Sequence, residues 1–143
     1  PEKHTLIPWV TKICGPFAED PDLDLVIPRR RSLESYPRIQ QLAEEMGREG
    51  FLRRTGRALD SWFGPQAFRA RVASYYLDYA GPPDLWDSIH VPAAKIIKAG
   101  HKVGEVVVDY QHPPEQLEEN TFLDYQKRIR QLATLCDALA NNV

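Results

Sequence analysis

Residues 122–139 read FLDYQKRIRQLATLCDAL, and this stretch carries the clearest periodic pattern in the chain. Its apolar side chains recur at alternating spacings of three and four, the rhythm of an α-helix with one buried seam. Two further leucines widen the stripe, which favours packing of this amphipathic helix against its own domain. Dimerisation, or capture of a partner helix, is the alternative. The seam consists of Phe122, Tyr125, Ile129, Leu132, Cys136 and Leu139.

The composition is that of an ordinary globular domain, with 143 residues, 43% of them hydrophobic and 27% charged. A chain of this length buries enough surface to fold without a disulfide or a structural metal. We therefore expect Cys14 and Cys136 to be small buried hydrophobic residues rather than disulfide partners. The sequence contains no apolar run long enough to span a membrane and no signal-peptide pattern, so we expect an intracellular location, cytoplasmic or nuclear.

Strand signals occur near the N-terminus and again after residue 100. Residues 5–13 (TLIPWVTKI) and 23–27 (LDLVI) are apolar and contain β-branched side chains, which predicts two strands. Pro8 would place the first of them at a sheet edge or in an extended arm. Residues 101–110 (HKVGEVVVDY) give the strongest strand prediction.

Proline and glycine mark the expected helices. A helix is predicted from Pro37 to Gly47 or Gly50, and a helical hairpin over residues 56–80 with Thr55 as its N-cap. Three more helical segments are predicted: one turn after Asp84 through Trp86, a short helix at 92–100 and the final helix, which begins at Pro114 or at the box-like residues 121–124.

These signals predict an α+β fold. We expect one mostly helical domain over residues 1–143, with a small sheet of two or three strands and a long C-terminal amphipathic helix. Its three parts would be an extended or strand arm (1–28), a helical region (29–100) and a strand followed by the last helix (101–143).

Charge is unevenly distributed, although the net charge is only −2. Residues 29–71 contain ten arginines against five acidic residues, a local net charge of +5, and no lysine. Arginine suits bidentate recognition of carboxylate or phosphate, and residues 51–57 (FLRRTGR) lie beside an expected helix N-terminus, where anions bind. The other interpretation is that the arginines pair with nearby acidic residues and the aromatic residues are core. The candidate binding residues are Arg29, Arg30, Arg31, Arg53, Arg54, Arg57 and Trp62.

Spacings that signal catalysis or metal binding are absent from the sequence. The four histidines are isolated, and neither a nucleophile elbow nor a glycine-rich phosphate loop is present. We therefore expect no metal, no cofactor and no catalytic residue. One enzyme-like alternative stays open: a small enzyme or ligand-binding pocket built around His90, His101 or Tyr75 and Asp78, with Trp86 as a wall.

The leading hypothesis is a non-catalytic macromolecular recognition domain, part of a larger protein or assembly. It would bind a protein partner through the arginine-rich face or the C-terminal helix, and a homodimer through that helix is one form of such binding. The first alternative is a nucleic-acid-binding domain that uses the arginine clusters, with an affinity that falls steeply with salt. A membrane partner is not expected.

Overall fold

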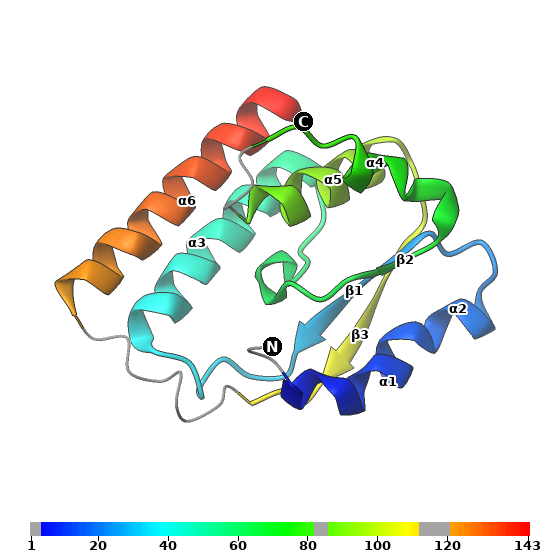
Figure 1. Ribbon diagram of the computed structural model, residues 1–143, viewed down its shortest axis with the longest axis horizontal. Helices are drawn as coiled ribbons and strands as arrows, with labels where there is room; N and C mark the ends of the chain where they lie inside the picture. The colour runs from blue at the N-terminus through cyan, green and yellow to red at the C-terminus, as the bar shows by residue number, and fades with distance from the viewer. Residues whose placement is uncertain (1–3, 82–85, 112–120) are drawn as a thin grey trace.

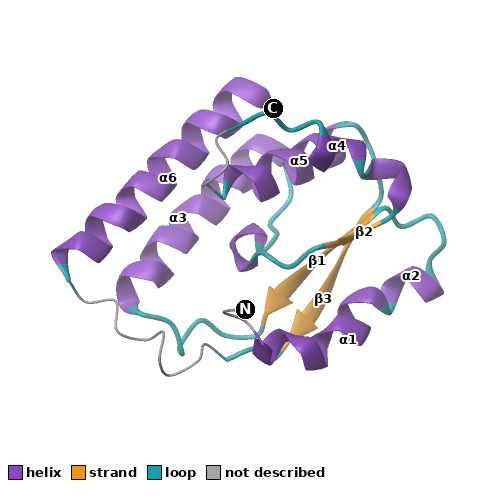
Figure 2. Ribbon diagram, in the orientation of Figure 1, coloured by secondary structure: helices purple, strands orange, loops and turns teal. Residues whose placement is uncertain are grey.

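A small sheet lies at the centre of the computed structural model, which describes residues 4–81, 86–111 and 121–143. Its strands β1 (Leu25–Arg30), β2 (Ala67–Phe68) and β3 (Val103–Val108) lie in the order β2-β1-β3. The middle strand β1 is parallel to β3 and antiparallel to β2. Figure 2 shows this sheet among helices, which confirms the expected α+β fold with a small sheet and a long C-terminal helix.

The two faces of β1 are covered by different helices (Figure 1). Leu25 and Ile27 belong to a core shared with three long helices, whereas Val26, between them, belongs to a second core shared with the N-terminal helices. This alternation is the period-two pattern of a strand buried on both sides. The helices in chain order are η1 (His4–Trp9), α1 (Val10–Cys14), α2 (Pro16–Glu19), α3 (Arg38–Thr55), η2 (Ser61–Phe63), η3 (Ala70–Val72), α4 (Ser74–Leu77), α5 (Asp87–Lys98) and α6 (Phe122–Asn142).

The strand prediction for residues 5–13 is wrong, because this segment is helical in η1 and α1. The side chains of Leu6, Trp9, Ile13 and Phe17 recur at spacings of three and four, and all of them pack into the second core. That packing outweighs the β-propensity of the intervening residues. The predicted extended arm is therefore a helical layer over one face of the sheet.

The helical hairpin predicted over residues 56–80 is also wrong. The helix before it, α3, runs on to Thr55 and ends at Gly56, whose φ of 73° is the left-handed conformation of a helix C-cap. The short helices η2, η3 and α4 follow, and between them Ala67 and Phe68 pair with β1 as strand β2. Gly64 and Pro65 interrupt the helical structure at the position where the first helix of the hairpin was expected to end.

Gly47 and Gly50 do not end α3 as predicted. Gly47 is buried inside the helix, and a methyl group at this position would overlap the Trp62 indole. The glycine therefore permits close approach of α3 to η2. Glycine at this position serves packing rather than termination.

The remaining helix ends agree better with the sequence. Thr121 and Asp124 form the capping box expected at the start of α6. The alternative start, Pro114, lies outside the described residues, as do His112 and Asp84. The helix predicted at 92–100 begins five residues earlier, so Pro92 lies inside α5. Cys14 and Cys136 are exposed and free, so their predicted burial is wrong.

Candidate binding surface on helices α3 and α6

Helices α3 and α6 lie side by side and run in the same direction (Figure 1). The Arg128 guanidinium of α6 donates to the Gln40 side chain near the start of α3, over 2.8 Å. At the other end, the Arg54 guanidinium donates to the Leu139 carbonyl oxygen in the last turns of α6, over 3.1 Å. These two contacts fix which sides of the helices face each other.

The inner side of this pair is polar near the helix starts, where a buried charge network centres on Arg30 of β1. The Arg30 guanidinium donates to both carboxylate oxygens of Asp60, over 2.8 and 2.7 Å, and to Glu44 of α3 over 2.6 Å. Gln40 donates to the other Glu44 oxygen over 2.6 Å and accepts from Arg128. All five side chains are buried.

Two arginines and two carboxylates balance the charge of this network, which is the condition for burying ions at acceptable cost. Burial disfavours the charged form of Arg30, but its hydrogen bonds to Asp60 and the negative charge of Glu44 outweigh this effect and raise the pKa of Arg30 above its ordinary value. The Arg30 guanidinium also stacks on the rings of Tyr36 and Phe63, at 4.8 and 5.2 Å from their centroids. Arg30 is therefore a core residue that ties β1 to α3.

The outer side of the same two helices exposes several large apolar side chains among charged ones. Met46 of α3 has an exposed fraction of 63%, and Phe122 and Ile129 of α6 have 76% and 62%. Leu42 and Tyr125 belong to the same surface and are also exposed. Because α3 and α6 lie side by side, we call these five exposed side chains together the outer α3–α6 face.

The predicted seam of α6 does not face the domain core as a whole. Leu139 is buried and Leu132 half-buried, whereas Phe122, Tyr125, Ile129 and Cys136 are exposed. The buried residues of α6 are Arg128, Leu135 and Leu139. Arg128 donates to Gln40 from the buried side of the helix, whereas the upstream seam residues Phe122, Tyr125 and Ile129 lie towards solvent. Nothing in the sequence marks Arg128 as a buried residue.

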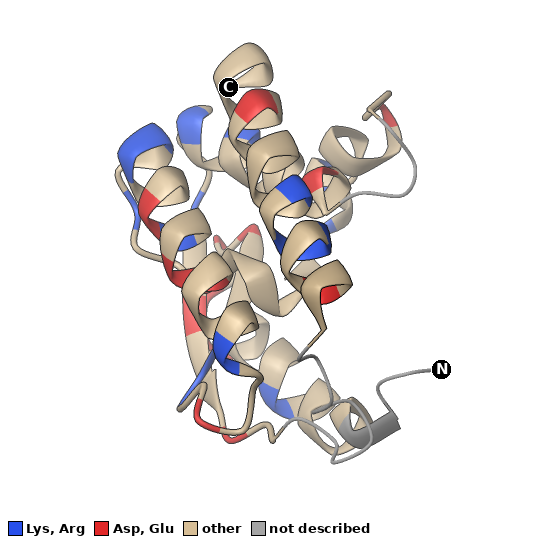
Figure 3. Ribbon diagram, turned by 90° about the vertical axis from the view of Figure 1, so that its left-hand side faces the viewer, with Lys and Arg blue, Asp and Glu red and all other residues tan. Residues whose placement is uncertain are grey.

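The arginines of β1 do not form one basic patch. Arg29 pairs with Glu105 of β3 over 2.7 Å, and Arg30 is buried as described. Arg31 is exposed and lies 3.9 Å from Asp109. Arg29 and Arg31, which directly follows β1, thus meet acidic residues on or just after β3, whereas Arg30 is buried against Asp60 and Glu44. In Figure 3 the basic residues are spread over several elements with acidic residues between them.

The arginines of segment 51–57 lie at the C-terminal end of α3, so the predicted helix N-terminus beside them is wrong. Arg53 pairs with Glu49 over 2.6 Å, and Arg57 donates to the Val103 carbonyl oxygen over 3.0 Å. Arg54 holds the end of α6, and Trp62 is buried in the core. Positively charged side chains in the last turn of a helix interact favourably with its dipole, so these arginines stabilise the fold.

The enzyme-like alternative is split between separate regions. His90 is fully buried among the rings of Phe51, Trp62 and Trp86, and burial lowers its pKa to about 4. His101 instead lies beside Tyr75, with 3.3 Å between its Nε2 and the Tyr75 hydroxyl. Asp78 lines a third region, next to α5 and α6. The predicted constellation around one pocket is therefore not formed.

The contacts of His101 link the starts of β1 and β3. Its Nδ1 lies 3.1 Å from the buried Asp24 carboxylate, which also accepts from the Lys102 amide and from the Arg71 guanidinium. Burial raises the pKa of Asp24, but the hydrogen bond from Arg71 and the further hydrogen bonds hold it below its usual value. Both ring nitrogens of His101 already have partners, which supports a structural role.

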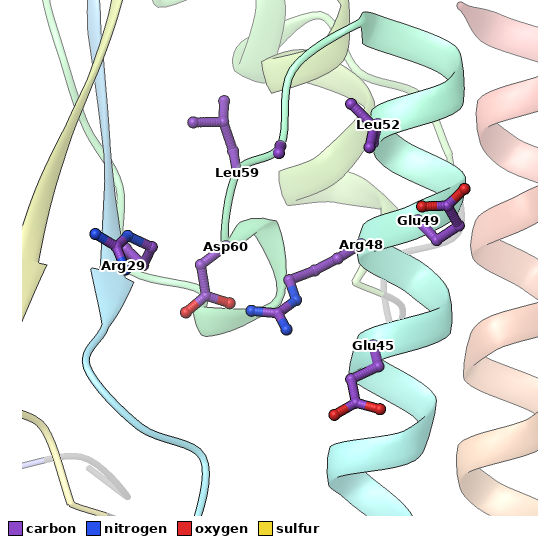
Figure 4. A pocket seen from close by; sticks show the side chains of 8 residues that line it. Arg29, Glu45, Arg48, Glu49, Leu52, Leu59 and Asp60 are labelled. Carbon is purple, nitrogen blue, oxygen red and sulfur yellow. The ribbon is translucent and has the colours of Figure 1, made fainter.

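A charged pocket of about 280 Å³ lies between α3 and the loop before η2 (Figure 4). Arg48 extends from α3 towards Asp60, and Arg29 lies on the far side of the pocket. Glu45 and Glu49 bring opposite charges to the same lining. Since Arg29 and Asp60 already have charged partners, the pocket shows no net preference for one sign of ligand charge.

Among the described ranges, no group of three or more His, Cys, Asp and Glu side chains is placed to hold a metal ion. None of the described helices combines the length and apolar character needed to cross a membrane. Comparisons with protein-family models, with curated proteins and with solved structures find no match.

Proposed function

We propose that this chain is a non-catalytic protein-recognition domain, part of a larger protein or assembly, which docks a partner helix on the outer α3–α6 face. The single observation that carries the proposal is the row of exposed apolar side chains on two adjacent helices, above all Met46 and Ile129. Contiguous exposed apolar surface is uncommon on soluble proteins that have no partner.

The geometry suits an amphipathic helix. Two parallel helices in contact leave a groove between their outer sides, and a third helix can pack into it with apolar residues at spacings of three and four. Each large side chain that becomes buried there contributes about 1.5–3 kcal/mol before the cost of association. A second copy of α6, presenting its own Phe122 and Ile129, is one such partner.

We favour this face over the arginines because the arginines already have partners. Arg29, Arg53 and Arg57 bind carboxylates or a carbonyl oxygen of the same chain. Phosphate contacts by these side chains would have to replace those interactions. Within the described ranges, the apolar side chains of the outer face stay largely exposed.

The test is an affinity capture from the native host with three baits: the wild-type chain, the double variant Met46→Gln with Ile129→Gln, and the control Lys98→Gln. Lys98 is exposed at the end of α5, away from the groove. Light scattering of each bait shows self-association directly. We expect one protein, or a second copy, to bind wild type and control but not the double variant. Equal binding to all three baits, or monomers without any bound protein, would contradict the proposal.

A further inference from the structure

A second cavity lies on the α5 side of α6, away from the outer α3–α6 face. It has a volume of about 430 Å³, within the range of small-molecule sites. Segment 78–81, helix α5 and the C-terminal half of α6 contribute its walls. We call it the acidic pocket, and its charged lining residues are Asp78, Asp87, Lys95 and Asp137.

Asp87 is the residue that distinguishes this pocket from a solvated acidic surface. Its exposed fraction is 2%, and its Oδ1 atom is buried without a hydrogen-bond partner among the described residues. Its Oδ2 atom accepts a hydrogen bond from the Tyr79 hydroxyl. A buried carboxylate oxygen without a partner is costly, so it marks a place where a donor is missing.

Tyr79 and Gly81 hold this carboxylate in place. Burial and the charge of Asp87 raise the pKa of Tyr79, which keeps its hydroxyl protonated as a donor. A methyl group at residue 81 would overlap the Tyr79 hydroxyl, so glycine is required for the tyrosine to reach Asp87. The donor to the Oδ2 atom of Asp87 is thus built into the fold, and Asp87 is itself one of the residues that line the acidic pocket.

The charges of the acidic pocket are uncompensated. In the described part of the chain, Asp78, Asp87 and Asp137 have no Lys, Arg or His partner within 4.0 Å, and Lys95 has no acidic one. Three carboxylates and one ammonium group complement a ligand with two positive groups and one negative group. A metal ion is disfavoured, because no metal-binding group of side chains is found in the described ranges.

We propose that the acidic pocket binds a small basic amino acid, with an ammonium group on Asp87 and the ligand carboxylate on Lys95. Charge-assisted hydrogen bonds of this kind are the strong ones in a partly buried site. Asp137, which lies on α6, and Asp78 bind the second cationic group. The site is independent of the outer α3–α6 face, so either proposal can fail without the other.

The experiment is a calorimetric titration of the full chain with L-lysine, 1,4-diaminobutane and L-glutamate, alongside amide NMR spectra. We expect lysine to bind most tightly, the diamine more weakly and glutamate not at all, with amide shifts confined to segment 78–81, α5 and α6. Asp87→Asn and Asp137→Asn should weaken lysine binding roughly tenfold or more. Asp109→Asn, an exposed residue after β3, is the matched control and should bind like wild type.

Lys95→Gln distinguishes binding of the ligand carboxylate from binding of its ammonium groups. It should weaken binding of lysine, whose carboxylate loses its partner, but leave binding of the diamine unchanged. Asp137→Asn keeps the assay informative if Asp87→Asn does not fold, because Asp137 is exposed. Absence of saturable lysine binding, or wild-type affinity in both aspartate variants, would overturn the proposal and leave a water-filled cavity.

Discussion

On the inner side of the α3–α6 pair polar side chains are buried, whereas on the outer side apolar side chains are exposed. Near the helix starts the inner side buries Gln40, Glu44 and Arg128, while the outer side exposes Met46 and Ile129. The inner residues satisfy one another through hydrogen bonds and balanced charge. The outer side chains stay exposed to solvent in the described part of the chain. The fold itself accounts for the inner arrangement, whereas the proposed docking would account for the outer one.

The inner network should give the largest effect. Asp60→Asn removes one buried carboxylate and leaves Arg30 and Arg128 with a single buried counterion, Glu44, which should cost about 3–5 kcal/mol of unfolding free energy. Urea denaturation measures this loss. The control Glu105→Gln breaks the exposed pair with Arg29 and should cost less than about 1 kcal/mol. Similar small losses in both variants would mean that the buried network does not stabilise the fold.

Acid titration tests the same inner core through His90. The pKa of His90 is lowered from 6.5 to about 4 because the ring is fully buried, whereas the unfolded chain takes up the proton near pH 6.5. Stability is therefore fully present above pH 6.5 and falls by about 3 kcal/mol as the pH approaches 4. Thermal unfolding across this window measures the loss. His90→Gln should flatten the dependence, and an unchanged slope in that variant would refute the assignment.

Substitutions of two glycines in α3 should have smaller effects on the unfolding free energy, and these effects should be of opposite sign. Gly47→Ala would drive a methyl group into the Trp62 indole on the inner side, which should cost about 1–3 kcal/mol. A Cβ at Gly50 would meet only the Cys136 Sγ, at 3.9 Å, so Gly50→Ala should stabilise the helix by about 0.5–1 kcal/mol. Chemical denaturation of both variants gives the sign. Equal shifts in the same direction would contradict the inner packing.

Substitutions on the outer face should have the smallest effect on folding. Met46→Gln with Ile129→Gln replaces two exposed apolar side chains by a polar residue that favours helix, so the unfolding free energy should stay within about 0.5 kcal/mol of wild type. Denaturation of the isolated chain measures this. A loss comparable with that of Asp60→Asn would show that the outer residues belong to the core.

Local signals in the sequence were sufficient for part of this fold. The β-branched run of residues 103–108 forms β3, and Thr121 with Asp124 caps α6, because both features depend on neighbouring residues. The N-terminal helices were missed because burial of the face of Trp9 and Ile13 outweighs strand propensity. The α+β class was still predicted correctly, because it depends on the overall mixture of helix and strand signals rather than on any single element.

The α6 part of the candidate surface was predicted as an apolar stripe but not in its orientation, and the α3 residues Leu42 and Met46 were not predicted as part of it. The periodicity of α6 identified Tyr125 and Ile129 as one apolar stripe, and the structure places that stripe outside. The reason is non-local: Arg128 donates to Gln40, 88 residues away, so the side of the helix that carries Arg128 faces α3. The pairing of Arg30 with Asp60 is likewise invisible to any pattern of neighbouring residues.

Site-specific photo-crosslinking tests the central claim most directly. A photoreactive phenylalanine derivative placed at Ile129 reports what covers the outer α3–α6 face inside the native host, and the same group at Lys98 reports on an exposed position elsewhere. We predict one discrete protein adduct from position 129 that disappears when Met46→Gln is added, and none from position 98. No adduct from position 129, or the same adducts from both positions, would contradict a docking role for this face.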